Sequence, residues 1–346
     1  MFMLPPGTAT GIGSLPGADA LAALDVVLAS FPDLPYWPQL PARSAAESMY
    51  LQFSGWWPGM VCREGRSYVD RAAVTPEAQA RLYAAFLGEA GGPELAAVPA
   101  TSAAGLYALE DRRPALAQAV AIKGHITGPI SLGLTLTDTD LRPLLYDDLL
   151  MDMALKGLAL SLRWQGAYLR QFNPSVVLFI DEPYLSTVGS GFFAYSRERA
   201  VAYLAELAAA VPGVAVGLHC CGNTDWTVAV EAGIAILSCD AYGFAPQLLT
   251  QAPVFDRHLR RGGSIAWGIV PSLEEQAAAE DALALTQRLE ELLAGLEARG
   301  VQGDRLRRQS LLTPACGLGG QSPDGAARIL GLTAAVAAAF RERHGL

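Results

Sequence analysis

Charged residues are scarce in this sequence, and the basic ones form no long run. They make up 17% of the 346 residues, against 51% hydrophobic residues, and the formal net charge is −9. Without a concentrated basic segment, the sequence predicts no nucleic-acid-binding surface. The high hydrophobic content instead predicts a large buried core and argues against extended disorder.

Long hydrophobic runs are also missing. Charged residues, Gly or Pro interrupt each apolar stretch before it reaches about 18 residues, so we expect no membrane-spanning helix and no membrane partner. The first seven residues, Met1 to Gly7, contain neither the basic region nor the apolar region of a signal peptide. We therefore expect a cytoplasmic protein.

Cysteine is infrequent as well, and its five residues are an odd number. In a chain of this size the odd count argues against a disulfide framework. Four of the five lie near the ends of expected strands in the C-terminal half, which makes metal binding or catalysis worth testing. The cysteines are Cys62, Cys220, Cys221, Cys239 and Cys316.

What the sequence does contain is a regular alternation of short apolar segments with longer amphipathic ones. The short segments are mostly bounded by Gly, Pro or Asp, which is typical of buried parallel strands. Eight strand-then-helix units predict an α/β fold, a single (β/α)8 or TIM barrel domain over residues 1–346. The expected strands are residues 10–12, 34–37, 120–126, 176–180, 214–218, 235–238, 264–267 and 309–312.

The longer periodic segments predict helices at residues 141–172, 196–210, 272–299 and 323–343. Residues 39–114, after the second expected strand, are too many for one strand-and-helix unit. We expect them to form an insertion that covers the barrel mouth and contains a helix at residues 75–88.

The most informative chemical pattern begins at His219. His219 and Cys221 alternate on an extended segment and so point to the same side, whereas Cys220 points away. Imidazole and thiolate are both zinc donors, and a catalytic zinc ion usually has three protein ligands. Cys316, at the end of the last expected strand, can supply the third. The sequence therefore predicts a zinc ion (Zn2+) at the barrel mouth, held by His219, Cys221 and Cys316.

Carboxylates follow two further expected strands. Asp240 can be the fourth metal ligand, or can accept a hydrogen bond from the imidazole, and Cys239 is the other candidate ligand. Asp181 and Glu182 come directly after an apolar strand, where a carboxylate can bind a substrate ammonium group or move protons. Helix capping and local salt bridges are the alternative roles for all these acids.

A glycine lies at the end of the first expected strand, in Ile12-Gly13-Ser14. Glycine allows a ligand to approach the backbone closely, so these three residues are candidate substrate contacts. A plain turn explains the same residues equally well. His125, which lies two residues before a similar turn, is expected to be structural.

Five motifs of this sequence resemble, in the same order along the chain, those of the C-terminal catalytic half of cobalamin-independent methionine synthase. The barrel superfamily of that enzyme also includes uroporphyrinogen decarboxylase. The matching motifs are Ile12-Gly13-Ser14-Leu15-Pro16, Thr127-Gly128-Pro129, Ile180-Asp181-Glu182-Pro183, His219-Cys220-Cys221 and Pro314-Ala315-Cys316-Gly317-Leu318.

The resemblance implies a substrate as well as a metal. Zinc would hold the thiol of homocysteine, and Asp181 would hold its amino group. The family's remaining zinc ligand is a glutamate, for which Asp240 is the nearest candidate here. We expect Asp181 and Asp240 to be the catalytic acids. Ile12 and Ser14 would provide backbone contacts. The family's acidic motif after the second strand has no match here, so Gln39 or Glu47 is expected to replace that substrate contact.

The expected activity is methyl transfer to the homocysteine thiol, which forms methionine. The family's folate-stacking tryptophan has no aromatic counterpart in residues 130–135, so we expect a methylated corrinoid protein or another non-folate donor. One alternative is a methylcobalamin:thiol methyltransferase that acts on a thiol such as coenzyme M. Residues 219–224 also resemble the zinc motif of that family. The other is a metal-free enzyme like uroporphyrinogen decarboxylase, although that family's arginine-rich first loop is here reduced to Arg43.

Overall fold

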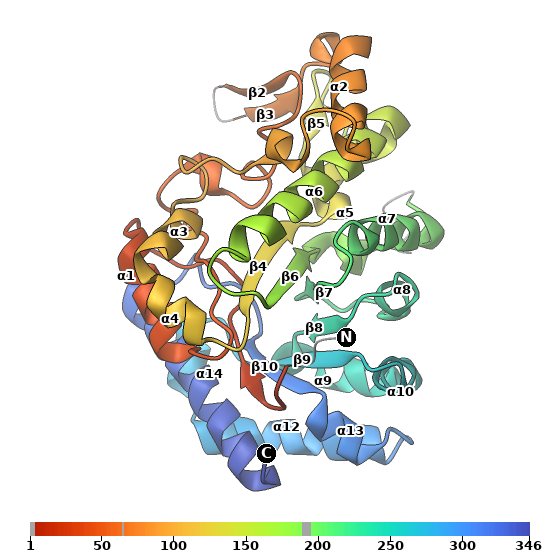
Figure 1. Cartoon of the computed structure of the whole chain (residues 1–346). Coiled ribbons are helices and arrows are strands. Elements are labelled where there is room, and N and C mark those ends of the chain that lie inside the picture. Colours follow the sequence, from red (N-terminus) through yellow and green to blue (C-terminus); the bar gives the residue numbers. More distant parts are fainter. Residues whose placement is uncertain (1–3, 64–65, 189–194) are drawn as a thin grey trace.

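A curled sheet of seven parallel strands forms the centre of the protein (Figure 1). The computed structural model describes residues 4–63, 66–188 and 195–346, so Met1 to Met3, part of the segment considered for a signal peptide, lie outside it. The strand order is β1-β10-β9-β8-β7-β6-β4. The strands are β1 (Thr8–Ala9), β4 (Ile122–Thr127), β6 (Val176–Asp181), β7 (Ala215–Cys220), β8 (Ile236–Cys239), β9 (Ser264–Val270) and β10 (Ser310–Pro314).

The expected second strand, residues 34–37, is not a strand in the structure. Tyr36 forms an isolated parallel bridge to β4, and Gln39 forms another to the stretch that follows β1. Pro35 and Pro38 explain the interruption, because proline has no amide proton to donate to a continuous ladder. The two edges of the sheet are thus linked through single bridges, and the first strand lies two residues earlier than expected.

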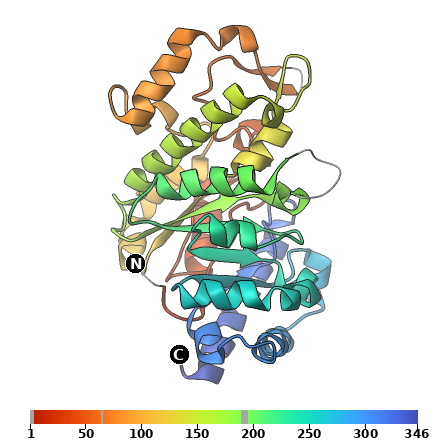
Figure 2. The same ribbon diagram turned by 90° about the vertical axis from the view of Figure 1, so that its right-hand side faces the viewer.

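Helices follow most strands and cover the outside of the sheet (Figures 1 and 2). Their bounds in the first half are α1 (Ala20–Ser30), α2 (Pro76–Leu87), α3 (Ala104–Tyr107), α4 (Arg113–Gln118), α5 (Pro129–Thr135) and α6 (Asp148–Leu169). In the second half they are α7 (Arg197–Ala209), α8 (Thr227–Glu231), α9 (Ala241–Thr250), α10 (Ala252–Arg260), α11 (Glu274–Ala278), α12 (Ala282–Glu297), α13 (Gly303–Arg308) and α14 (Pro323–His344).

Helix prediction succeeded where the caps agree with the periodicity, as in α2, α7 and α14. Two expected helices were too long. Asp147 caps α6, which therefore begins seven residues later than expected, at Asp148. Asp281 caps α12 through its contact with the Ala284 amide, and this cap divides the expected helix 272–299 into α11 and α12.

Side chains alternate along each strand between the inside of the curled sheet and the helices outside it. On β6, Val177 and Phe179 belong to an inner apolar cluster, whereas Leu178 and Ile180 belong to the larger core beneath the helices. The same alternation gives Asp181, the last residue of β6, an inward direction. Inward side chains at the carboxyl ends of the strands therefore build the floor of any site there.

Much of the segment 39–114 lies apart from the main sheet. Its strands β2 (Met60–Arg63) and β3 (Arg66–Val69) pair antiparallel, and β3 pairs in parallel with β5 (Thr137–Asp138). This small sheet lies beside α2 at one end of the molecule (Figure 1). None of the helices in the described part of the chain has the length and apolar character that a membrane crossing needs.

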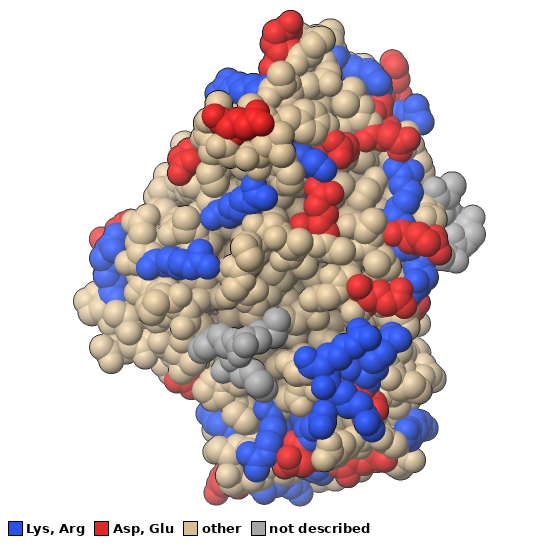
Figure 3. Space-filling view, turned by 45° about the vertical axis from the view of Figure 1, so that its right-hand side comes forward, with Lys and Arg blue, Asp and Glu red and all other residues tan. Residues whose placement is uncertain are grey.

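Basic side chains gather over the region of α10 and α13 on the face seen in Figure 3. Several have an acidic partner one helical turn away, such as Arg260 with Asp256 at 2.7 Å and Arg308 with Asp304 at 2.9 Å. Exposed pairs of this kind contribute only a few tenths of a kcal/mol, about 0.3–0.5 per pair on a helix. They also place positive charge near helix C-termini, where the helix dipole favours it.

Candidate metal centre

Three donor side chains meet at the carboxyl ends of β7 and β10. His219 is the fifth residue of β7, Cys221 follows that strand directly, and Cys316 comes two residues after β10. Their ligand atoms all lie within 4.8 Å of one another. Within residues 4–63, 66–188 and 195–346, this is the one group of three or more His, Cys, Asp or Glu residues with metal-ligand spacing. The predicted donors are therefore brought together.

The imidazole of His219 is buried, and its two nitrogens have different surroundings. Nδ1 lies 3.0 Å from the Ser238 hydroxyl oxygen, on the neighbouring residue of β8. Nε2 is buried without a hydrogen-bond partner. The contact suits the tautomer with the proton on Nδ1, which leaves the Nε2 lone pair for another ligand. Since an unpartnered buried nitrogen is costly, this atom fits a metal ion.

The two thiols are electrostatically unequal. Hydrogen bonding from Cys316 and the nearby His219 lower the pKa of Cys221 to about 4. The Cys221 thiolate and burial raise the pKa of Cys316. A hydrogen bond from one thiol therefore favours the thiolate form of the other. Thiolates are the ligand form of cysteine, so this donor set also fits a zinc ion.

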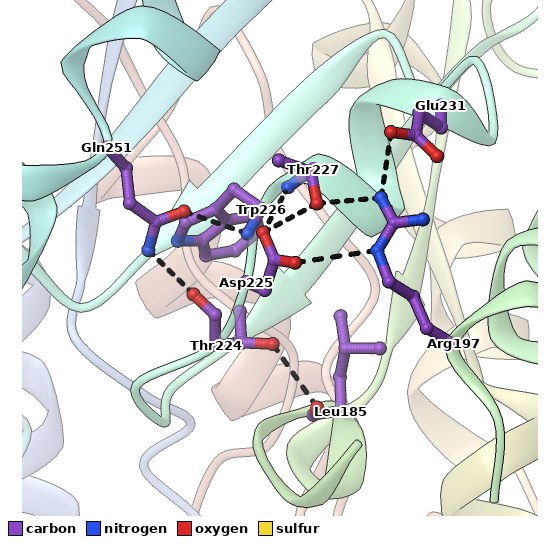
Figure 4. A network of polar contacts seen from close by, with 8 residues as sticks. All are labelled: Leu185, Arg197, Thr224, Asp225, Trp226, Thr227, Glu231 and Gln251. Carbon is purple, nitrogen blue, oxygen red and sulfur yellow. Dashed lines mark hydrogen bonds and ion pairs between the residues drawn. The ribbon is translucent and has the colours of Figure 1, made fainter. Parts of the chain in front are cut away.

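A polar network holds the loop that carries Cys221 (Figure 4). The Thr224 hydroxyl donates to the Leu185 carbonyl at 3.2 Å, and the Gln251 side chain donates to the Thr224 carbonyl at 2.7 Å. Arg197 of α7 lies 3.6 Å from the Asp225 carboxylate in the same loop. The loop is thus tied to three different elements, which limits the movement of Cys221.

Ser14 fixes the loop that carries Cys316. The Ser14 carbonyl accepts a hydrogen bond from the Leu318 amide at 2.9 Å, and its hydroxyl accepts one from Gly319 at 3.2 Å. A Cβ atom on Gly317 would lie 2.3 Å from the Ser14 hydroxyl, so a side chain at position 317 would displace this hydroxyl. The predicted contribution of Ser14 is therefore at least partly structural.

A cavity of about 300 Å³ opens beside the three donors. Asp181 is the acidic residue in its lining, and one of its carboxylate oxygens is buried without a hydrogen-bond partner. Burial raises the pKa of Asp181, while Lys123 and His219 act in the opposite direction. The lining consists of Ile12, Gly13, Ser14, Gln39, Pro41, Met49, Asp181, Pro183, His219, Cys221, Cys316, Gly317, Gly319 and Gly320.

Glu182, also a predicted substrate contact, is not among the residues lining the cavity. Its carboxylate accepts hydrogen bonds from the Ile130 and Ser131 amides at 2.8 and 2.9 Å, and from the Ser131 hydroxyl at 2.6 Å. Burial raises the pKa of Glu182 to about 7, against the effect of these donors. Glu182 thus joins the end of β6 to the first turn of α5.

The two candidates from the segment after β1 differ in position. Gln39 lines the cavity, and its side-chain amide donates to Gln52 at 2.9 Å. Glu47 is fully buried and accepts hydrogen bonds from Arg43 at 2.7 Å and from the Leu40 amide at 3.1 Å. Glu47 therefore holds its own loop together and does not line the cavity.

Asp240 and Cys239 lie beside the donor group without being part of it. One Asp240 oxygen accepts a hydrogen bond from the Gly243 amide at 2.6 Å and caps α9. Burial and the nearby Cys221 raise the pKa of Asp240. The Cys239 thiol is buried in the outer core, 3.9 Å from the Ala266 carbonyl. Cys220 lies in the same core.

Sequence reasoning overlooked Lys123 and treated His125 as merely structural. Both are inward residues of β4 and fully buried. The His125 ring stacks on Trp37 with 3.9 Å between centroids, and neither of its nitrogens has a hydrogen-bond partner. A Cβ on Gly13 would lie 3.1 Å from this ring, so His125 stands directly behind the cavity wall. A lysine and a histidine at alternate positions of an otherwise apolar strand could have indicated two polar side chains inside the curled sheet.

Comparison with models of protein families and with sequences of characterised proteins gives no match. Solved structures do match. A methyltransferase from Methanosarcina mazei aligns over 99% of this chain and 94% of its own, with 16% identity and a TM-score of 0.51. A B12-independent methionine synthase from Shewanella sp. W3-18-1, in complex with selenomethionine, aligns over 68% of this chain and 67% of its own, with 20% identity and a TM-score of 0.48. The chain thus shares the fold of the Methanosarcina methyltransferase.

Proposed function

We propose that this protein is a zinc-dependent S-methyltransferase. The observation that carries the proposal is the group His219, Cys221 and Cys316, with donor atoms within 4.8 Å and a buried, unpartnered Nε2, beside an open cavity. Three protein donors next to open space are typical of catalytic zinc, whereas structural zinc usually has four protein ligands. The two sulfur donors also favour zinc over magnesium or calcium.

When bound, zinc would lower the pKa of a substrate thiol and so supply a sulfur nucleophile at neutral pH. Cys221 and Cys316 would bring two negative charges to the site, which keeps a substrate sulfur electron-rich. This charge favours attack on a methyl group over the polarisation of a carbonyl. Ser238 would orient His219, and the loop contacts of Thr224 would orient Cys221.

We infer that the acceptor is homocysteine. A cavity of about 300 Å³ suits an amino-acid-sized thiol, and the unpartnered Asp181 oxygen suits its ammonium group. Among the described residues that line the cavity there is no Lys or Arg. A polycarboxylate such as a tetrapyrrole would lack cationic partners there, which argues against the decarboxylase alternative. Another small thiol, such as coenzyme M, is the remaining alternative, but it has no ammonium group to pair with the Asp181 carboxylate.

The donor is proposed to be a methylated corrinoid protein or another non-folate compound. Transfer from methylcobalamin requires no proton on the leaving group, whereas transfer from a folate amine does. Residues 130–133 at the start of α5 are buried, and residues 130–135 contain no aromatic side chain on which a folate could stack. We also infer that the bridges of Tyr36 and Gln39 complete an eightfold barrel, with residues 39–114 covering part of its mouth.

Single-turnover methyl transfer to homocysteine tests the proposal. We expect product with methylcobalamin or a methylated corrinoid protein, and little with methyltetrahydrofolate. Cys221→Ser should lose both zinc and transfer, while Cys62→Ser, an exposed cysteine outside the site, should keep both. Efficient turnover of methyltetrahydrofolate would refute the corrinoid donor. Full activity of metal-free Cys221→Ser would refute the zinc-dependent reaction.

A further inference from the structure

Lysine occurs only twice in the sequence, as Lys123 and Lys156. Lys123 is 1% exposed and is the one Lys or Arg among the described residues that is fully buried. Its ammonium group lies 4.8 Å from the Phe179 ring centre and 5.4 Å from that of Tyr36. A charge in such apolar surroundings is costly to bury, which raises the question of what it does there.

The ammonium group of Lys123 donates a hydrogen bond to the Ile12 carbonyl, just behind the cavity wall. The next carbonyls of this wall are also engaged, since Gly13 accepts from the Gln39 amide at 3.0 Å and Ser14 accepts from Leu318 at 2.9 Å. The Gly13 and Ser14 amides, in contrast, make no hydrogen bond to another described residue. The Ser14 nitrogen faces the Cys316 loop, 3.8 Å from where a Cβ of Gly317 would be.

In this part of the cavity lining, the Gly13 and Ser14 amides are therefore free to donate, whereas the carbonyls of Ile12, Gly13 and Ser14 already accept from other partners. Amide donors in a row attract anions. A cation behind them strengthens the attraction, because charges interact over several ångströms in a poorly solvated interior. The free amides and the Asp181 carboxylate belong to the lining of one cavity, and together they suit a zwitterion that carries both a carboxylate and an ammonium group.

We propose that Lys123 is a positioning residue that fixes the Ile12–Ser14 wall and supplies the positive charge for binding the carboxylate of the thiol substrate. The inference rests on the proposed function, because it needs a thiol that binds in this cavity. Burial lowers the pKa of Lys123 to about 8, and the nearby Asp181 opposes that shift, so the lysine remains mostly charged at neutral pH.

The test compares two thiols that differ only in the carboxylate, homocysteine and 3-mercaptopropylamine. Their Kd values are measured by calorimetry on zinc-loaded wild type, Lys123→Met and the control Lys156→Met. Lys156 is half-buried on α6 and pairs with Asp152 and Glu206, away from the cavity. Methionine matches the lysine in length but leaves the Ile12 carbonyl without its donor, so the Tm and circular dichroism of Lys123→Met are measured to show that the variant is folded.

We expect Lys123→Met to raise the Kd of homocysteine roughly tenfold or more, as loss of a unit charge near the carboxylate implies. Its Kd for 3-mercaptopropylamine should be unchanged, and Lys156→Met should bind both thiols as the wild type does. An equal loss for both thiols, or a lowered Tm with no selectivity, would overturn the inference. If wild-type protein binds neither thiol, the proposed function itself fails, and the inference with it.

Discussion

The hydroxyl of Ser238 contacts the ring nitrogen of His219 that does not face the other donors. Such a contact fixes both the ring orientation and the tautomer, so a hydroxyl outside the donor group influences how well Nε2 can bind a cation. The cost of this arrangement is a buried nitrogen without a partner whenever no cation is present.

Ser238→Ala should therefore weaken zinc binding about 10- to 100-fold, because the imidazole loses its orienting partner. Ser161→Ala is the matched control, since Ser161 is equally buried but bonds to the Ala96 carbonyl in another region. Competition with a coloured chelator measures both affinities. Equal affinities in the two variants would show that Ser238 does not orient the ligand.

Substitutions of Asp240 can show whether this residue caps α9 or binds the metal ion. If it caps α9, as its bond to Gly243 indicates, Asp240→Ala should lower the free energy of unfolding by about 1 kcal/mol, and Asp240→Asn by much less. Both variants should keep one zinc per chain, measured by elemental analysis. Loss of zinc from both would instead identify Asp240 as the fourth ligand.

At the scale of elements, the site depends on how β6 is joined to α5. Glu182 fills the first turn of α5 and leaves no room beside it, since a Cβ on Gly128 would lie 2.1 Å from the Glu182 carboxyl carbon. Asp181, the preceding residue and the last of β6, lines the cavity, so the Glu182 contact anchors the backbone next to a residue of the site.

Glu182→Gln should lower the free energy of unfolding by about 2–4 kcal/mol, because its new NH2 group would face the amide and hydroxyl donors of α5. Urea denaturation measures the loss. Glu94→Gln, at an exposed acid, is the control and should change stability little. A loss no larger than that of the control would contradict the bridging role of Glu182.

The sequence predicted elements well where apolar periodicity and capping residues agree, as in β6, β7 and α14. It failed at residues 34–37, where apolar side chains resemble a strand but two prolines interrupt the ladder. Strand alternation was sufficient to predict that His219 and Cys221 would meet. It could not predict that Glu47 and Glu182 satisfy backbone amides, because their partners come from loops whose path the sequence does not define.

At the scale of the whole molecule, the donor group joins segments that are distant in the chain. His219 lies on β7 and Cys221 directly after it, whereas Cys316 follows β10. Two strands, β8 and β9, separate β7 from β10, and the curling of the sheet brings the three donors together. The fold has a large apolar core of its own, so the cation is not needed to form it. Stability and metal binding should therefore be separable.

Removal of zinc by a chelator should lower the Tm by a few degrees and leave the far-ultraviolet circular dichroism unchanged. Binding at 1,000 times the Kd stabilises by about 4 kcal/mol, which is modest for a chain of this size. Cys316→Ala should have the Tm of the metal-free wild type and should not respond to the chelator. Loss of secondary structure on chelation would mean that the ion is structural.

In the proposed site, the zinc ion has three protein ligands and one position for a thiol. Zinc X-ray absorption on the purified protein, with and without homocysteine, tests it most directly. We expect two sulfur neighbours and one imidazole without homocysteine, and a third sulfur when it is added. An unchanged shell with four protein ligands, or purified protein without stoichiometric zinc, would contradict it.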